Sequence, residues 1–231
     1  MASVTRVSPP PEIEYPDSDG KPMSDHTLQY KWIVVIREGL ADQFVDDPNI
    51  FVGANLLWYP VEGKPTIRGA PDVLVAFGRP QGERGSYKQW QEGGIVPQVV
   101  FEVLSPGNRP GEMKRKFQFY EQYGVEEYYV YDPFSGSLEG WRRRGGELKK
   151  IARMRGFVSP RLGIRFEPLE GQDNLTILDC HGQPFLTPQE ISRRRTEAER
   201  RAENAELRAE NAELRAEQYA AKLRERGIEP D

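Results

Sequence analysis

The chain has 231 residues, of which 37% are hydrophobic and 29% are charged, and its formal net charge at pH 7 is −4. This length allows one domain of moderate size with an appendage. The net negative charge does not by itself indicate a nucleic-acid-binding protein, although one face of the protein can still be locally basic. The single cysteine, Cys180, excludes an intramolecular disulfide and a cysteine-based zinc cluster, which favours a reducing compartment.

The sequence predicts a cytoplasmic protein without a membrane partner. No early apolar run resembles a signal peptide, and no stretch approaches the roughly 20 apolar residues of a membrane helix. Residues 1–23 are rich in proline and acidic residues and predict a flexible or extended segment. Ser24 or Asp25 can cap a helix that runs to about Phe44.

The segment from residue 50 to residue 105 predicts strands. Residues 50–59 indicate one strand, and the apolar run after Asp72 indicates a second. Between the predicted strands, the Gly-rich and charged residues 79–95 predict a mobile loop. The unbroken apolar run within residues 97–105 is typical of a central strand that is covered on both faces.

The remaining elements complete an α/β domain over residues 24–186. A helix is expected over about residues 111–123, ended by Gly124, and a strand over residues 126–131. Two hairpin-like segments then extend to about residue 180. The expected fold is a mixed sheet flanked by helices.

Residues 187–231 predict a C-terminal coiled-coil helix. The heptad Arg-Ala-Glu-Asn-Ala-Glu-Leu at 201–207 repeats unchanged at 208–214, which indicates a left-handed supercoil. With Leu207 and Leu214 at d positions, the a positions are asparagines, often found in parallel dimers. Two alternatives remain open: a stripe of alanines with Tyr219, and a single solvated helix held by pairs four residues apart. The alanines are Ala202, Ala205, Ala209, Ala212 and Ala216.

Two carboxylates beside apolar strands are the candidate metal ligands. Asp72 and Glu102 each border an apolar run, where an unpaired carboxylate is costly to bury. Two carboxylates near one gap are typical of a hydrolytic Mg²⁺ site. Lys116, on the following helix, can reach the same strand ends, and Tyr120 shares its helix face. The alternatives are a turn at Asp72, an arginine pair at Glu102 and a solvated lysine.

The order of these motifs resembles the Uma-type putative restriction endonuclease family of the PD-(D/E)XK nuclease superfamily. The motifs are Pro71-Asp72, Glu102-Val103-Leu104-Ser105-Pro106, Lys116 with Tyr120, Gly124-Val125 with Glu127-Tyr128, and Asp132-Pro133. The resemblance covers roughly residues 24–190. It implies a restriction-endonuclease-like fold, Mg²⁺ or Mn²⁺ held by Asp72 and Glu102, and hydrolysis of phosphodiester bonds in DNA. The spacing along the chain suggests Lys116 as the third catalytic residue.

The sequence departs from the superfamily pattern at Leu104, where the motif lysine is expected two residues after Glu102. We interpret Lys116 as its substitute, moved from the strand to the helix. An acidic residue of the first helix often joins such sites, and the candidates are Glu38 and Asp25, with His26 nearby. These assignments predict a metal-dependent endonuclease that acts as a homodimer through its sheet domain, its coiled-coil tail or both.

Two rival functions come from other classes. The first is a catalytically silent nuclease fold that acts as an assembly module through its coiled coil. The second is a transcription-linked regulator that uses the tail as a zipper. A basic segment at residues 142–155 could contact phosphates or form a solvated hairpin.

Overall fold

The computed structural model describes residues 13–18, 20, 26–169, 171 and 173–225. The chain divides into two compact units between Phe185 and Leu186. The second unit contains one helix, α3 (Pro188–Glu225), whose side chains from 189 to 218 are exposed. None of the described helices has the length and apolar character needed to cross a membrane.

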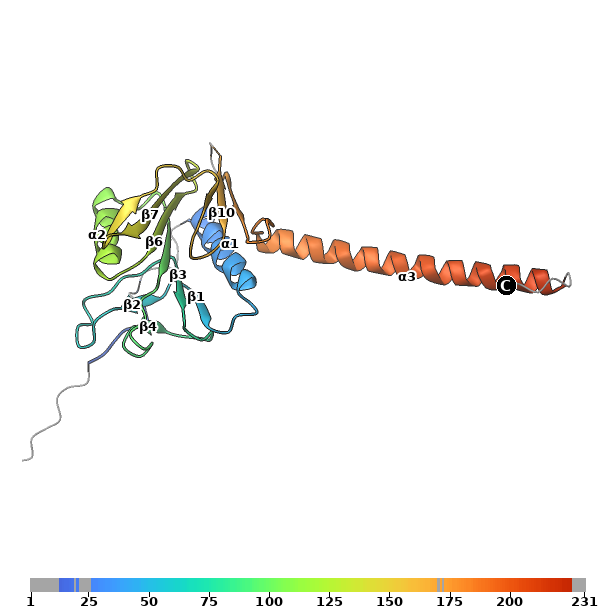
Figure 1. Ribbon diagram of the computed structural model, residues 1–231, viewed down its shortest axis with the longest axis horizontal. Coiled ribbons are helices and arrows are strands. Elements are labelled where there is room, and N and C mark those ends of the chain that lie inside the picture. Colours follow the sequence, from blue (N-terminus) through green and yellow to red (C-terminus); the bar gives the residue numbers. More distant parts are fainter. Residues whose placement is uncertain (1–12, 19, 21–25, 170, 172, 226–231) are drawn as a thin grey trace, which may run out of the picture. The chain divides into compact units, whose positions relative to one another are not determined.

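The first unit is built on a six-stranded mixed sheet (Figure 1). Its only parallel pair is formed by the two central strands β5 and β6, and α2 (Pro110–Gln122) makes the crossover that a parallel pair requires. All five residues of β5 are buried, as its continuous apolar run predicts. In spatial order the strands are β1 (Ile50–Ala54), β3 (Val73–Phe77), β5 (Val99–Val103), β6 (Glu127–Asp132), β7 (Ser137–Arg144) and β8 (Glu147–Lys150).

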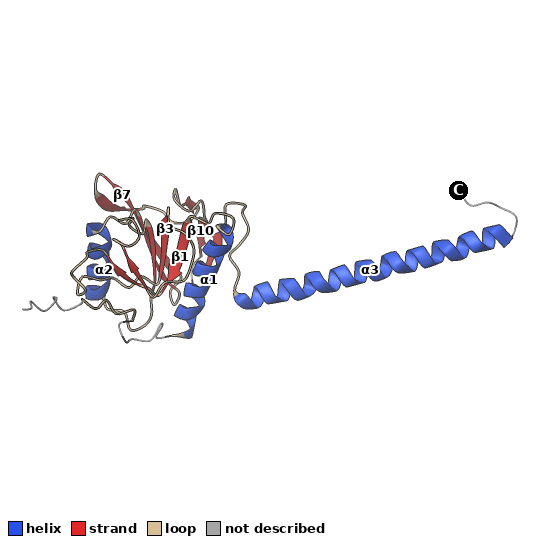
Figure 2. Ribbon diagram, turned by 90° about the horizontal axis from the view of Figure 1, so that it is seen from below, coloured by secondary structure: helices blue, strands red, loops and turns tan. Residues whose placement is uncertain are grey.

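Each face of this sheet has its own hydrophobic core, and Figure 2 shows the strands between α2 and α1 (Thr27–Gln43). Because side chains alternate along a strand, Val99, Phe101 and Val103 pack toward α1, whereas Val100 packs toward α2. Smaller sheets complete the two faces. They contain β9 (Phe157–Val158), β10 (Arg165–Pro168) and β11 (Leu175–Leu178) on the α1 side, and β2 (Leu57–Tyr59) and β4 (Ser86–Lys88) on the α2 side.

Two element boundaries differ from the sequence-based expectation. The first helix begins at Thr27 and is capped by His26, whose Nδ1 accepts a hydrogen bond from the Leu28 N–H at 3.1 Å. The expected caps Ser24 and Asp25 lie outside the described residues. The expected strand 50–59 is divided because Asn55 adopts a left-handed backbone with φ of 53°, which asparagine tolerates better than most residues.

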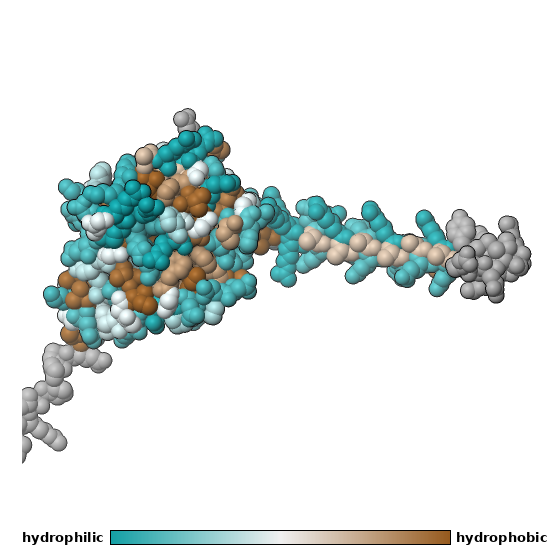
Figure 3. Space-filling view, in the orientation of Figure 1, coloured by the Kyte–Doolittle hydropathy of each residue, from teal (hydrophilic) through white to brown (hydrophobic). Residues whose placement is uncertain are grey.

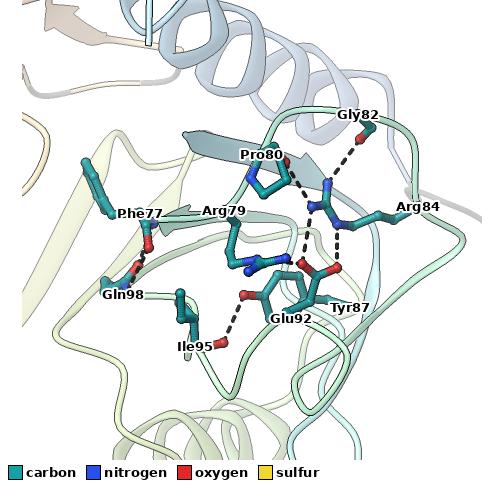
Figure 4. Close-up of polar contacts among 9 residues, drawn as sticks. All are labelled: Phe77, Arg79, Pro80, Gly82, Arg84, Tyr87, Glu92, Ile95 and Gln98. Atoms are coloured by element: carbon teal, nitrogen blue, oxygen red, sulfur yellow. Dashed lines mark hydrogen bonds and ion pairs between the residues drawn. The ribbon is translucent and has the colours of Figure 1, made fainter. Parts of the chain in front are cut away.

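The segment 79–95, expected to be a mobile loop, contains β4 and is anchored by a buried carboxylate (Figure 4). Glu92 is 8% exposed and accepts hydrogen bonds from Arg79 Nε at 2.8 Å and Arg84 Nε at 2.6 Å. Burial raises the pKa of Glu92, but the two arginines outweigh it and the net pKa is lowered. The hydroxyl of Tyr87 donates to Ile95 O at 2.9 Å and fixes the end of the segment. These contacts and β4 show that the segment is not the structureless loop that its composition predicts.

Candidate active site

Asp72 and Glu102 meet at one edge of the sheet because of the register between β3 and β5. These strands run antiparallel and pair Val73 with Phe101, so one step further along the same register Asp72 lies opposite Glu102. Leu74 and Val100 point toward α2, and strand alternation places both carboxylates on that same face. The two acidic residues of the sequence motif are therefore neighbours under α2.

Lys116 reaches this pair from α2. Its Nζ lies 2.6 Å from Glu102 Oε2 and donates to the carbonyl oxygen of Ala70 at 3.3 Å. Glu102 is only 2% exposed, so the ammonium group compensates a carboxylate that would otherwise be buried without a partner. Burial lowers the pKa of Lys116, but Glu102 and Asp72 outweigh it, and the net pKa is raised. The structure thus brings Asp72, Glu102 and Lys116 together.

Tyr120, one turn after Lys116, holds the other oxygen of the same carboxylate. Its hydroxyl donates to Glu102 Oε1 at 2.5 Å, and its ring is fully buried. Burial, followed by the nearby Glu102, raises the pKa of Tyr120 well above its usual value. The phenol therefore stays protonated and remains a hydrogen-bond donor, which fixes the rotamer of Glu102.

Asp72 is held in place by the backbone of β5. Its Oδ2 accepts the N–H of Val103 at 2.7 Å. Burial and the negative charge of Glu102 raise the pKa of Asp72 to about 8, against the opposing effects of Lys116 and the Val103 N–H. In the absence of a bound cation, Asp72 is therefore protonated at neutral pH and hydrogen-bonded to Glu102.

The donor set of this cluster fits a hard divalent cation. Asp72 and Glu102 supply carboxylate oxygens, and Mg²⁺ is commonly bound by one or two carboxylates with its remaining positions taken by water and substrate phosphate. Within the described part of the chain, no group of three or more acidic, histidine or cysteine side chains has metal-binding geometry. The Lys116 ammonium contacts Glu102 Oε2 and the carbonyl oxygen of Ala70, which shows that a positive charge is accommodated at this position. The residues present therefore suit a divalent cation that prefers oxygen ligands rather than a zinc ion enclosed by protein ligands.

Among the described residues, the first helix contributes an amide to the neighbourhood of the site, and its candidate carboxylate Glu38 lies elsewhere. Glu38 is exposed and forms an ion pair with Arg37 at 2.6 Å, and His26 caps α1. Asp25 lies outside the described residues. Gln29, which is buried, donates from Nε2 to the carbonyl oxygen of Val103 at 2.9 Å.

The spacing of apolar residues along the first helix predicts that Gln29 is buried, although a polar residue is not expected there. Gln29 lies four residues before Ile33, and Ile36 and Leu40 continue the same stripe at helical spacing. A polar residue on the buried stripe of a helix needs a hydrogen-bond partner, and here that partner is the residue after Glu102. The stripe therefore predicts burial of Gln29, although not its contact with β5.

Leu104 occupies the place of the expected strand lysine and packs, partly buried, against the core on the α2 side. Alternation along the chain puts position 104 on the same face as Glu102. Because α2 covers that face, a lysine on α2 can reach Glu102 directly, as the 2.6 Å contact shows.

Three residues of the basic segment at 142–155 have structural partners. Arg143 caps the C-terminal end of α2, donating from Nη2 to Glu121 O at 2.6 Å and from Nε to Val125 O at 2.8 Å. Lys149 forms an ion pair with Glu147, and Lys150 forms one with Glu139. These pairs reduce the positive charge that the hairpin could offer to phosphates.

Glu126 and Glu127, at the beginning of β6, also have structural partners. Glu127 is buried and accepts hydrogen bonds from the hydroxyls of Tyr129 and Ser159 and from the Arg161 N–H. Glu126 forms a two-point ion pair with the Arg161 guanidinium at 2.6 and 2.5 Å. Both residues fasten β6 to the segment that leads into β10.

Comparison with known proteins identifies a family and a similar solved structure. Residues 9–168 match the family Uma2, described as "Putative restriction endonuclease". Among solved structures, the chain is similar to a putative nuclease of the DUF820 family from Anabaena variabilis, with 14% identity and a TM-score of 0.40. That similarity covers 60% of this chain and 73% of the other. No curated protein matches the sequence significantly.

Proposed function

Because the chain belongs to the Uma2 family of putative restriction endonucleases, we propose that it is a metal-dependent endonuclease that hydrolyses phosphodiester bonds in DNA. The observation that supports this most strongly is the convergence of Asp72, Glu102 and Lys116 on one face of the sheet. We further propose that residues 24–186 form the catalytic domain and residues 187–231 a self-association helix. The single cysteine fits a cytoplasmic location.

In this proposal each residue has a distinct role. Asp72 and Glu102 would hold Mg²⁺ or Mn²⁺, which when bound supplies an activated water and neutralises charge on the phosphate. Asp72 must lose its proton before it can act as a ligand, because its pKa is raised to about 8 in the metal-free protein. Lys116 stabilises negative charge that develops on the phosphoryl oxygens, and Tyr120 positions Glu102.

Self-association would suit cleavage of a duplex. A symmetric dimer presents the same site twice, so each copy can act on one of the two strands. The exposed α3 helix offers a surface for this contact, and it belongs to a different unit from Asp72, Glu102 and Lys116.

The decisive experiment is a cleavage assay on plasmid DNA and a structured RNA, with Mg²⁺ or Mn²⁺ and with EDTA as the metal-free control. We expect Asp72→Asn and Glu102→Gln to reduce cleavage by at least about 100-fold, because each removes a charged ligand. Glu38→Gln, which changes an exposed acidic residue on α1, serves as the matched control. Equal activity in all four proteins would remove the proposed site.

A catalytically silent assembly module remains the second candidate, and Leu104 is the observation that favours it. The superfamily lysine is absent from its usual strand position, and the Lys116 contact with Glu102 could serve only to neutralise a buried charge. Calorimetric titration with Mn²⁺ separates the two functions. A protein that self-associates but binds no metal at millimolar concentration, and cleaves neither nucleic acid, is the assembly module.

A further inference from the structure

The α3 helix exposes the only two leucines of its heptad repeats. Leu207 and Leu214 are 56% and 53% exposed, although leucine is normally buried. They lie seven residues apart and therefore on nearly the same face of the helix. Asn204 and Asn211 flank them and donate from Nδ2 to the backbone carbonyls four residues earlier, both at 2.7 Å. This face combines apolar surface with regularly spaced amides.

We propose that α3 pairs with α3 of a second copy as a parallel, in-register coiled coil, with leucines 207 and 214 at d and asparagines 204 and 211 at a. Asparagine at an a position specifies the register and the number of strands at a cost in stability, and the leucines at d supply the apolar contact that offsets this cost. The inference rests on the self-association part of the proposed function and is independent of cleavage.

The charges beside this face select the parallel orientation. In the leucine frame the g positions are Glu203 and Glu210, and the e positions are Arg208 and Arg215. In a parallel pair each g residue faces the e residue of the partner's next heptad, so glutamate meets arginine in both layers. An antiparallel pair would place g beside g and e beside e, which brings like charges together. The sequence therefore makes one orientation attractive and the other repulsive.

The alanine stripe on the other side of the helix is the competing surface. Figure 3 shows a continuous, weakly apolar stripe along α3 between hydrophilic rows. It is flanked by a different set of glutamates, Glu206 and Glu213, which lie at c positions in the leucine frame. Each alanine layer removes less apolar surface from water than a leucine layer, and the stripe has no polar residue that would specify a register. We therefore assign the contact to the leucine face.

Matched charge reversals distinguish the two faces. Sedimentation equilibrium of the full chain measures the dimer dissociation constant for wild type, for Glu203→Arg/Glu210→Arg, and for Glu206→Arg/Glu213→Arg. Both double variants change the net charge equally. We expect the first to weaken association at least about tenfold, because arginine then faces arginine across the leucine seam. The second should stay within about threefold of wild type.

Cysteine cross-linking tests the register on the same chain. In a Cys180→Ser background, Asn211→Cys should form an intermolecular disulfide on mild oxidation, whereas the neighbouring Ala212→Cys should not, because only position 211 lies in the leucine seam. The proposal would be overturned in favour of the alanine face if Glu206→Arg/Glu213→Arg weakened dimerisation more than Glu203→Arg/Glu210→Arg and Ala212→Cys formed the cross-link. A wild-type chain that stays monomeric over the whole concentration range would overturn pairing altogether, whatever its nuclease activity.

Discussion

The raised pKa of Asp72 predicts that the metal-free protein loses stability as the pH increases. In the unfolded chain this carboxyl group titrates near 3.8, and in the folded protein near 8. Below about pH 4 Asp72 is protonated in both states, and the free energy of unfolding has its full value. Between about pH 4 and 8 only the folded state keeps the proton, so the free energy of unfolding falls as the pH rises. Above about pH 8 the free energy of unfolding becomes constant again. The Asp72→Asn variant lacks this titration and should remain more stable at high pH.

The loss of unfolding free energy follows from the difference between the pKa values of Asp72 in the folded and unfolded states. About four pH units at roughly 1.4 kcal/mol each set a ceiling of about 6 kcal/mol. Asp72 is only half-buried, so water at the rim of the site reduces the expected loss to about 2–4 kcal/mol between pH 5 and 8.5. Urea denaturation in EDTA, compared between wild type and Asp72→Asn, measures it. The exposed Asp46→Asn is the control and should follow wild type.

Parallel pH profiles for wild type and Asp72→Asn would refute this reasoning, because they would mean that Asp72 is not held protonated by burial and by Glu102. Addition of Mg²⁺ gives a second check on the same proteins. An ion that binds only the folded state stabilises it in proportion to the logarithm of its concentration. At pH 8.5, millimolar Mg²⁺ should therefore restore stability to the wild type and not to Asp72→Asn.

Three further predictions concern the partners of buried carboxylates. Lys116→Met should cost about 2–4 kcal/mol of unfolding free energy in urea denaturation, since it removes the ammonium group from Glu102, while Lys114→Met on the exposed side of α2 should cost less than about 0.5 kcal/mol. Tyr120→Phe should cost about 1–2 kcal/mol and reduce cleavage, because Glu102 Oε1 loses its donor. Glu92→Gln should cost about 2–4 kcal/mol and leave metal affinity unchanged in calorimetric titration; weakened metal binding would connect the 79–95 segment to the site.

The sequence predicts the central sheet and the charged cluster because both depend on short-range patterns. The apolar run of β5 identifies a buried central strand, and its single acidic residue, Glu102, stands out within it. Lys116 follows at a distance that one short helix can span, so its contact with Glu102 can be anticipated from spacing. Family membership is confirmed by the match over residues 9–168.

Other features depend on contacts that local patterns do not encode. The segment 79–95 has the composition of a loop, yet Glu92 pairs with two arginines that lie 13 and 8 residues earlier in the chain. Gln29 meets the carbonyl of Val103 across 74 residues. The expected acidic contribution from Glu38 fails because that residue lies on the exposed side of α1 beside Arg37.

The position of Lys116 on α2, rather than on β5, affects how related chains can be recognised from their sequences. When the catalytic lysine lies on the same strand, two residues after the glutamate, strand geometry fixes the spacing between them. A short sequence motif then identifies both residues. Here the residues from 104 to 109 connect β5 to α2, so insertions or deletions there could alter the spacing while the helix still docks in the same place. A search that demands a fixed interval would discard such chains as degenerate, whereas one that asks for a lysine followed four residues later by tyrosine on the crossover helix would retain them.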